Sequence, residues 1–323
     1  MPCVPGRRFH AYKPVIELAA LRKEYDNVLA VDDLNLSIPQ GEIFGLIGPN
    51  GAGKTTTIRM ACGLLAPTLG RAMIAGVDVA QDPEKAQQHI GYLSDFFAVY
   101  EDLKVWEYLD YFAHAYKMPE ADIPARVTEV ISQVNLDVKR DAMIRGLSRG
   151  MKQRLGIARA IIHRPKVMLL DEPASGLDPK ARLELRNLLL SLRDQGATIL
   201  ISSHILTELE GFCTSIGIME KGRMVRSGSI AEVTAAAATT RLVRMTWAGD
   251  SLAMAQEKLR SDARVSEVNL AAGVGTFRFS GAEEDLAPVL ASLVAANLQL
   301  TSFGEVKQTV EELYMKLSTH EVM

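Results

Sequence analysis

The sequence has no apolar run near the roughly 18 residues that a membrane-spanning helix needs. Its longest apolar runs, at 167–170 and 197–201, have the length of strands. The N-terminal residues also lack the apolar core of a signal peptide. We therefore expect a soluble, cytoplasmic protein, and any role at a membrane would depend on a partner protein.

An excess of positive charge is also missing. The 36 basic residues are balanced by 39 acidic ones, so the formal net charge is -3. Domains that bind nucleic acids usually carry a clustered basic surface, and we therefore expect no nucleic-acid partner. The three cysteines, Cys3, Cys62 and Cys213, have no metal-ligand spacing and suit reduced thiols better than disulfides.

The chain is long enough for two folded domains. It has 323 residues, of which 48% are hydrophobic and 23% charged, and this is an ordinary globular composition. The alanine- and threonine-rich segment 235–240 marks a change in composition. We predict a leader at 1–14, a main domain at 15–234 and an accessory domain at 235–323.

The main domain alternates short apolar runs with helical stretches. Such runs predict strands that are buried on both faces, as in an α/β sheet. A helix is expected at 180–194, where leucines recur at helical spacing. The alternation predicts a sheet covered by helices, with strands at 15–20, 42–47, 167–170 and 198–202.

The accessory domain has a different pattern. Its predicted order is β-α-β-β-α-β, which is the order of a small α+β ferredoxin-like domain. A closing helix is expected at 309–316. The strands are expected at 241–247, 264–270, 275–279 and 299–306, and the helices at 252–259 and 285–298.

A glycine-rich loop follows the strand at 42–47 and precedes a helix expected at 56–64. It matches the pattern G-x-x-x-x-G-K-[ST], in which backbone amides and a helix N-terminus surround phosphate oxygens. Lys54 would add a point charge to the outer phosphates, and the hydroxyl of Thr55 would ligate Mg²⁺. The alternative is a structural turn. The candidate phosphate-binding residues are Gly48, Pro49, Asn50, Gly51, Ala52, Gly53, Lys54, Thr55 and Thr56.

Two carboxylates end the apolar strand at 167–170. Ligands of open α/β sheets bind at the carboxyl ends of the strands, so Asp171 and Glu172 are placed to act there. Asp171 would hold Mg²⁺, and Glu172 would orient or deprotonate an attacking water. Two solvated acids at a strand end remain the alternative.

The ordered motifs over about 15–228 resemble the ABC ATPases, which are P-loop NTPases with a helical subdomain, here expected at about 96–163. Leu147-Ser-Arg-Gly-Met151 resembles the signature sequence of that family, and Ala174-Ser-Gly-Leu-Asp178 resembles its D-loop. The resemblance implies ATP and Mg²⁺ as cofactors and a second ATP-binding subunit as partner. It also implies these roles: adenine stacking for Tyr25, contact with the partner's ATP for Ser148 and Gly150, a nucleotide-site position for Asp178, and contact with the γ-phosphate for His204.

Two of these roles have a plainer alternative, namely a surface or core aromatic at Tyr25 and a capping histidine at His204. Three residues also depart from the family pattern. Arg149 stands in place of a glycine and Met151 in place of a glutamine. Asp95 stands where the family has a glutamine that touches Mg²⁺. A carboxylate is also a hard oxygen ligand, so Asp95 is a metal candidate, with a solvated loop aspartate as the alternative.

The aromatic-rich segment 96–100 follows Asp95 directly. In the resembling family, a coupling helix of the transmembrane permease subunit docks at this place, while the alternative is the core of the helical subdomain. The C-terminal extension resembles that of exporter ATPases. The resemblance therefore implies an ATPase that powers transport, with export favoured, and that lies at the inner face of the membrane through its permease.

Three other functions fit the sequence less well. A soluble ABC ATPase acting on ribosomes usually carries two nucleotide-binding units per chain, whereas this chain has one glycine-rich loop of that kind. ABC ATPases that act on chromosomes or DNA insert long heptad stretches, and 67–146 contains none. A phosphate-loop kinase would lack the signature sequence.

Overall fold

The computed structural model describes residues 14–96, 98–205, 208–209, 211–230, 232–233, 241–249 and 252–306. The chain divides into two compact units, 1–230 and 231–323. The predicted boundary after residue 234 and most of the predicted leader lie outside the described residues, so the predicted domain limits stay predictions. In the described residues, no helix is both long enough and apolar enough to cross a membrane.

A six-stranded sheet with the order β10-β9-β3-β8-β7-β6 forms the centre of the first unit. Strands β6, β7, β8, β3 and β9 run parallel, and β10 is antiparallel to β9. The central strands are continuous apolar runs because helices or a second sheet cover both faces. The strands predicted from 42–47, 167–170 and 198–202 all lie here. The bounds are β3 Ile43–Ile47, β6 Ile90–Leu93, β7 Val167–Leu170, β8 Thr198–Ser203, β9 Ser215–Glu220 and β10 Arg223–Ser229.

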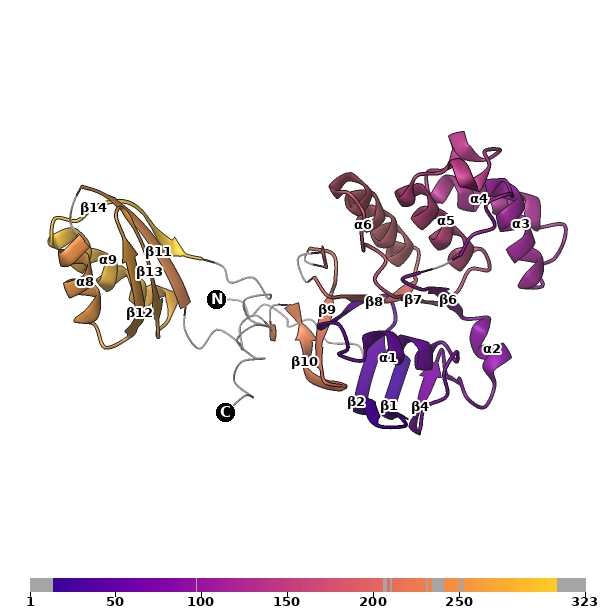
Figure 1. Ribbon diagram of the computed structural model, residues 1–323, viewed down its shortest axis with the longest axis horizontal. Helices are drawn as coiled ribbons and strands as arrows, with labels where there is room; N and C mark the ends of the chain where they lie inside the picture. Colours follow the sequence, from indigo (N-terminus) through magenta and orange to yellow (C-terminus); the bar gives the residue numbers. More distant parts are fainter. Residues whose placement is uncertain are drawn as a thin grey trace, which may run out of the picture. The chain divides into compact units, whose positions relative to one another are not determined.

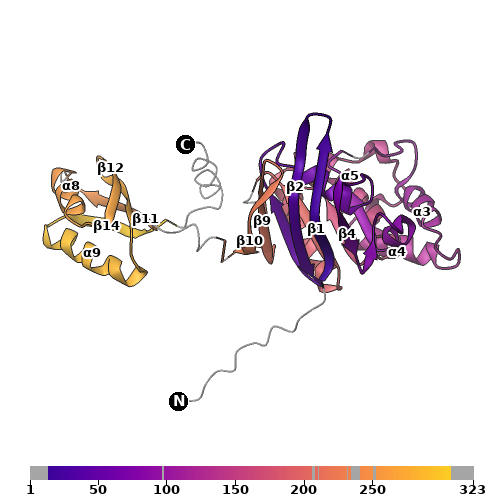
Figure 2. The same ribbon diagram turned by 90° about the horizontal axis from the view of Figure 1, so that it is seen from below.

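A second sheet is antiparallel and has the order β2-β1-β4-β5. The sequence predicted only its first strand, which is longer than expected. Ile16 pairs with Ile38 on one side and with Ile74 on the other. Figure 2 shows β1, β2 and β4 side by side. The bounds are β1 Pro14–Tyr25, β2 Val28–Pro39, β4 Leu69–Ile74 and β5 Val77–Asp78.

Helices cover the six-stranded sheet. Figure 1 shows α5 and α6 on one side of it, and α1 with the antiparallel sheet on the other. Helices α3, α4 and α5 lie in the segment where a helical subdomain was predicted. The helix bounds are α1 Lys54–Ala61, α2 Pro83–Gln87, α3 Val105–Ala115, α4 Ile123–Gln133, α5 Arg149–Ile161 and α6 Pro179–Asp194, with 3₁₀ helices η1 Asp137–Lys139 and η2 Ile144–Gly146.

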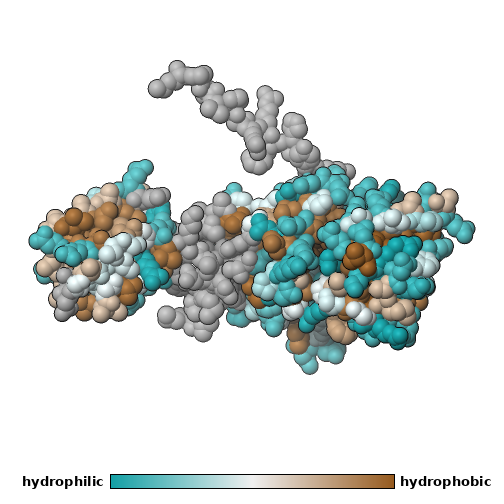
Figure 3. All heavy atoms as spheres, turned by 90° about the horizontal axis from the view of Figure 1, so that it is seen from above, coloured by the Kyte–Doolittle hydropathy of each residue, from teal (hydrophilic) through white to brown (hydrophobic). Residues whose placement is uncertain are grey.

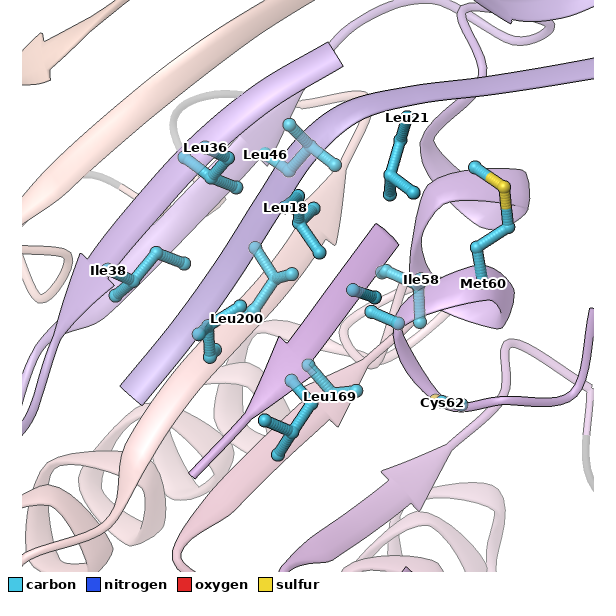
Figure 4. Packing of buried hydrophobic residues seen from close by; sticks show 14 of the residues in the cluster. Leu18, Leu21, Leu36, Ile38, Leu46, Ile58, Met60, Cys62, Leu169 and Leu200 are labelled. Atoms are coloured by element: carbon cyan, nitrogen blue, oxygen red, sulfur yellow. The ribbon is translucent and has the colours of Figure 1, made fainter. Parts of the chain in front are cut away.

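A hydrophobic core joins the two sheets and α1 (Figure 4). Leu18 of β1, Leu46 of β3 and Ile58 of α1 belong to it together with Leu169 and Leu200. Burial of each such side chain stabilises the fold by about 1.5–3 kcal/mol. Because β3, β7 and α1 share this core, the loops at the ends of these strands are held in one place. On the face shown in Figure 3, hydrophilic side chains divide the hydrophobic surface of this unit into patches.

The second unit has a four-stranded antiparallel sheet with the order β12-β13-β11-β14. Phe277 and Phe279 of β13 are fully buried against its helices. The elements follow the chain order strand, helix, strand, strand, helix, strand, while the ferredoxin-like assignment stays a prediction. The helix predicted at 309–316 lies outside the described residues. The bounds are β11 Arg241–Ala248, α8 Leu252–Arg260, β12 Val265–Ala271, β13 Val274–Phe279, η4 Glu283–Asp285, α9 Leu286–Ala295 and β14 Gln299–Glu305.

Candidate active site

The glycine-rich loop connects β3 to α1 and needs its glycines for steric reasons. Gly51 has a φ of 83° and Gly53 a φ of 100°, a region that disfavours side chains. A Cβ atom on Gly53 would lie 2.5 Å from the carbonyl oxygen of Ala30, and one on Gly48 would lie 2.3 Å from that of Met219. The loop can therefore lie directly against β2 and β9, which leaves its other side open.

Lys54 starts α1 and is only 5% exposed. Its Nζ donates to the carbonyl oxygens of Gly48 at 2.7 Å and Pro49 at 3.1 Å, and it lies 3.4 Å from Oε1 of Glu172. The first turn of α1, which includes Thr55, carries no acidic side chain. A buried ammonium group and an uncompensated helix N-terminus together favour an anion at this point.

Asp171 and Glu172 follow β7 directly. Asp171 is 1% exposed, and its Oδ1 accepts a hydrogen bond of 2.7 Å from Oγ of Ser202. Glu172 adopts a φ of 50°, which is uncommon for a residue with a side chain. Its backbone N–H donates to the same Ser202 oxygen at 3.0 Å. At the end of β7, the carboxylate of Asp171 is therefore buried against Ser202. The carboxylate of Glu172 instead lines a cavity.

Glu172 also contacts His204, which follows β8. Nδ1 of His204 lies 2.6 Å from Oε2 of Glu172. The histidine side chain is 40% exposed and that of Glu172 is 12% exposed. Glu172 therefore connects Lys54 of the phosphate loop with His204, and all three face the same space.

That space is a cavity of about 690 Å³, which is within the usual size of a ligand pocket. Among its lining residues are many that were predicted as site residues, from five separate parts of the chain. The predicted residues that line it are Tyr25, Asn50, Gly51, Ala52, Gly53, Lys54, Thr55, Thr56, Asp95, Glu172 and His204. Tyr25 is 43% exposed there, and Nζ of Lys23 lies 5.1 Å from the centroid of its ring.

The remaining predicted residues do not line this cavity. Gly48, Pro49 and Asp171 lie next to residues that do, since two of them bind Lys54 and one precedes Glu172. Ser148 caps α5 by accepting from the N–H of Met151 at 3.3 Å, two residues from Gly150 in that first turn. Asp178 caps α6 by accepting from the N–H of Ala181 at 2.9 Å. The structure therefore does not bring Ser148, Gly150 or Asp178 to this cavity.

Asp95 is a carboxylate of the cavity with a raised pKa. Burial, followed by the negative charges of Asp171 and Glu172, raises its pKa above the ordinary value, while Arg149 and His204 act in the opposite direction. A divalent cation would relieve this repulsion. In the described residues, no group of three or more His, Cys, Asp or Glu side chains could hold a metal alone.

The oxygen donors around the cavity fit Mg²⁺ nonetheless. This ion is usually bound by one or two carboxylates together with substrate phosphates rather than by a cage of protein ligands. Asp171, Asp95 and the hydroxyl of Thr55 are hard donors of that kind. The residues present are therefore suited to a magnesium–nucleotide complex.

Sequence patterns did not predict several residues at the site. Ser202 bonds the carboxylate of Asp171 and the backbone N–H of Glu172, and its place two residues before His204 is the one signal in the sequence. Ser175 also lines the cavity, and it lies in the segment that resembles the D-loop, although no role was predicted for it. The other lining residues that were not predicted belong to no motif, and they are Val28, Leu29, Ala30 and Lys221. Lys221 reaches the cavity because the turn between β9 and β10 touches the phosphate loop, where the N–H of Gly222 donates to the carbonyl of Ala52 at 3.1 Å.

Comparison with known proteins agrees with this geometry. A family model described as ABC transporter matches residues 31–175. The chain is similar to the probable multidrug ABC transporter ATP-binding protein YbhF of Escherichia coli, with 37% identity over 67% of this chain and 37% of the relative. It is also similar to the Nod factor export ATP-binding protein I of Cupriavidus metallidurans, with 37% identity over 66% of this chain and 71% of the relative.

The matched region thus spans about a third of the length of the first relative and most of the second. A solved structure titled as an ATP-binding subunit of an ABC transporter superposes with a TM-score of 0.63 and 32% identity, covering 69% of this chain and 92% of that one. The resemblance inferred from the motifs and the predicted P-loop fold of the first unit are therefore confirmed. This chain belongs to the ABC transporter family of ATP-binding proteins.

Proposed function

We propose that the chain binds ATP with Mg²⁺ and hydrolyses it to power transport through a separate membrane permease. The observation that carries this proposal is the connection of Lys54, Glu172 and His204 at one cavity of about 690 Å³. A phosphate cradle with its lysine and a carboxylate able to position water are recurring parts of sites for phosphoryl transfer, and here a histidine contacts that carboxylate.

Each group has a distinct task in this proposal. The phosphate loop, through the backbone amides of 48–55 and Nζ of Lys54, holds the outer phosphates. Glu172 orients or deprotonates the attacking water, and His204 contacts the γ-phosphate. Thr55 and Asp171 would hold Mg²⁺, with Asp95 as a further ligand; when bound, this ion neutralises charge on the phosphates.

The proposal includes a second ATP-binding subunit. Ser148, Gly150 and Asp178 lie at the starts of α5 and α6, outside the cavity of their own subunit. Helix N-termini favour anions, so Ser148 and Gly150 at the start of α5 are suited to the phosphates of a nucleotide bound by another subunit. Asp178, whose carboxylate caps α6, would lie beside the same nucleotide site without binding its phosphates. ATP would then hold two subunits together, whether identical or different.

A separate surface is suited to the transmembrane permease. A cavity of about 400 Å³ lies beside Asp95 and includes apolar and charged side chains. Phe96 is 89% exposed at its edge, as expected of a groove that receives a helix. The lining residues are Asp95, Phe96, Val99, Leu147, Arg149, Lys152 and Gln153. Docking there would hold the protein at the inner face of the membrane.

Export is the favoured direction. The two curated relatives named above are called a multidrug transporter component and an export protein, which supports this direction without naming a cargo. We further propose that 235–323 is a ferredoxin-like accessory domain and that no nucleic acid is bound.

The function is tested with the purified full chain. ATP binding and phosphate release are measured for the wild type, for Lys54→Ala and for Lys180→Ala, which removes a lysine from the surface of α6. Lys54→Ala should lose tight ATP binding, because it removes the buried charge of the cradle, whereas Lys180→Ala should bind normally. Equal affinity of Lys54→Ala and wild type would refute the cradle assignment.

The partner is tested by purifying the chain from its native membrane and identifying the bound proteins by mass spectrometry. Recovery of a protein with several membrane spans is expected. Recovery of ribosomes or nucleic acid in its place would favour a soluble ABC ATPase without a transport role.

A further inference from the structure

We propose that Ser202 is a positioning residue of the hydrolytic site, which sets the orientation of both Asp171 and Glu172. This inference rests on the proposed function, because it assumes that these carboxylates serve the magnesium ion and the attacking water. Ser202 itself would touch neither the nucleotide nor the metal.

One hydroxyl group connects the two acidic residues. Oγ of Ser202 donates to Oδ1 of Asp171 at 2.7 Å and accepts from the backbone N–H of Glu172 at 3.0 Å. Ser202 is 0% exposed, so water does not compete for these bonds. A serine hydroxyl can donate once and accept twice, and here it does both at once.

The pairing of two strands places Ser202 at this point. Strands β7 and β8 are parallel, and Leu170 is paired with Ile201. The next residue of each strand, Asp171 and Ser202, therefore lies at the same end of the sheet. All residues of β8 are buried, which leaves the hydroxyl little freedom to turn elsewhere.

The hydrogen bond from Ser202 fixes the orientation of the Asp171 carboxylate. In the described residues, Ser202 provides the one side-chain hydrogen bond to this group, and it engages Oδ1 only. A hydrogen bond from a fixed donor orients a carboxylate and leaves the second oxygen, Oδ2, available. Partners of this kind tune metal ligands, and their removal typically costs about 10- to 100-fold in metal affinity or activity.

The bond from Glu172 holds an unusual backbone conformation. The φ of 50° at Glu172 lies in the left-handed region, where a residue with a Cβ is strained and needs support from its surroundings. Acceptance of its N–H by Ser202 provides such support. The same conformation allows the Glu172 side chain to reach Lys54 at 3.4 Å and His204 at 2.6 Å.

The neighbouring serine shows that this role is specific to one position. Ser203 is also buried, but its hydroxyl donates to Oε2 of Glu208 at 2.8 Å, and among the described residues it makes no hydrogen bond to Asp171 or Glu172. Successive side chains of a strand point to opposite faces of a sheet, which explains why the two serines have different partners.

The test compares Ser202→Ala with a matched control, Thr198→Val. Thr198 lies four residues earlier on β8, is 0% exposed and accepts the backbone N–H of Gly41 at 2.9 Å, so its variant also removes a buried hydroxyl from this strand. ATP affinity is measured by calorimetry in EDTA and in Mg²⁺, and the Mg²⁺ concentration for half-maximal hydrolysis is measured separately.

For Ser202→Ala we expect an ATP affinity in EDTA close to that of the wild type. The gain in ATP affinity that Mg²⁺ gives the wild type should be lost, and the Mg²⁺ concentration for half-maximal hydrolysis should rise about 10-fold or more. Ser202→Thr, which retains the hydroxyl, should show a Mg²⁺ dependence close to that of the wild type. Thr198→Val should show the wild-type Mg²⁺ dependence even where its melting temperature falls. If Ser202→Ala does not fold, Ser202→Cys replaces it, because a thiol is a weaker donor of similar size, and the same direction is expected.

Asp171→Asn, measured in parallel, separates the two proposals. If Asp171→Asn alters the Mg²⁺ dependence and Ser202→Ala does not, the role of Ser202 is refuted and the proposed function stands. If Asp171→Asn itself leaves the Mg²⁺ dependence unchanged, the magnesium assignment in the proposed function is wrong, and the role of Ser202 is lost with it.

Discussion

Oε2 of Glu172 lies 2.6 Å from Nδ1 of His204, and Oε1 of the same side chain lies 3.4 Å from Nζ of Lys54. The carboxylate thus bridges a residue of the phosphate loop and a residue that follows β8. Groups that act as one unit show strongly non-additive effects when they are substituted. We therefore expect the double variant of Glu172 and His204 to be little less active than the worse single variant.

Glu172→Gln should lower turnover by about 10²- to 10⁴-fold, the usual range for the loss of a positioned acid–base group. Glutamine keeps the size and a hydrogen-bonding oxygen but removes the charge and the basicity. ATP binding should persist, because Lys54, Thr55 and Asp171 remain. Phosphate release and calorimetry measure the two effects, with Glu257→Gln in α8 as the control for the same chemical change in the other unit. A wild-type rate from pure Glu172→Gln protein would remove Glu172 from the mechanism.

The Glu172→Gln protein should form an ATP-dependent dimer, because ATP that is not hydrolysed remains between the subunits. Size-exclusion chromatography should show a dimer with ATP and Mg²⁺ and a monomer with ADP. Adding Ser148→Arg should abolish the dimer, since a bulky side chain at the start of α5 would block the contact with the partner's phosphate. Persistence of the dimer in this double variant would contradict the role proposed for Ser148.

A truncated protein that ends at residue 234 should still bind ATP. All residues that line the cavity of about 690 Å³ lie before residue 222, and the first compact unit ends at 230. Calorimetry should give an affinity within a few-fold of the full chain. A truncated protein that is folded by circular dichroism but does not bind ATP would show that the predicted domain boundary is wrong.

Asp95→Asn should raise the Mg²⁺ concentration needed for hydrolysis by up to about 10-fold, if Asp95 is a metal ligand. Burial and the charges of Asp171 and Glu172 raise the pKa of Asp95, and a cation among these groups would offset that repulsion. ATP affinity in EDTA should not change. Identical Mg²⁺ titrations of the variant and the wild type would leave Asp95 without a role at the metal.

His163 should make stability depend on pH below neutrality. Burial lowers its pKa from 6.5 to about 4, and its ring stacks on Tyr116 with centroids 3.7 Å apart. Between these two pKa values the unfolded chain takes up a proton that the folded one does not, so stability falls as the pH drops from 6.5 towards 4. The loss approaches about 3.4 kcal/mol at the lower end of this range, at 1.36 kcal/mol per pKa unit.

Urea unfolding at pH 7 and pH 4.5 measures this effect. His163→Phe should be less stable at pH 7, because the carbonyl of Ile90 loses its partner at 3.0 Å, but its stability should depend less on pH than that of the wild type. His114→Phe is the control, since the His114 side chain is 52% exposed. An equal pH dependence of His163→Phe and wild type would show that another group is responsible.

Local patterns were sufficient to predict the core of the site. Residues 42–64 have the pattern of a strand, a glycine-rich loop and a helix in that order. Residues 167–172 have the pattern of an apolar strand that is followed by Asp171 and Glu172. These features depend on neighbours in the chain: Gly51 and Gly53 permit positive φ values, and Asp178 caps the helix that follows it. The fold class followed for the same reason, since short apolar runs alternating with helices are typical of a parallel α/β sheet.

Contacts between distant segments were decided only by the tertiary structure. Pairing of Leu170 with Ile201 brings Ser202 to Asp171, and packing of the β9–β10 turn on the phosphate loop brings Lys221 to the cavity. Most of the antiparallel sheet also escaped prediction. The physical reason is that strand register and packing depend on which distant residues are buried together. The sequence by itself determined which chemical groups this protein has and which of them follow a strand or begin a helix. The long-range pairing of strands decided which of these groups come into contact.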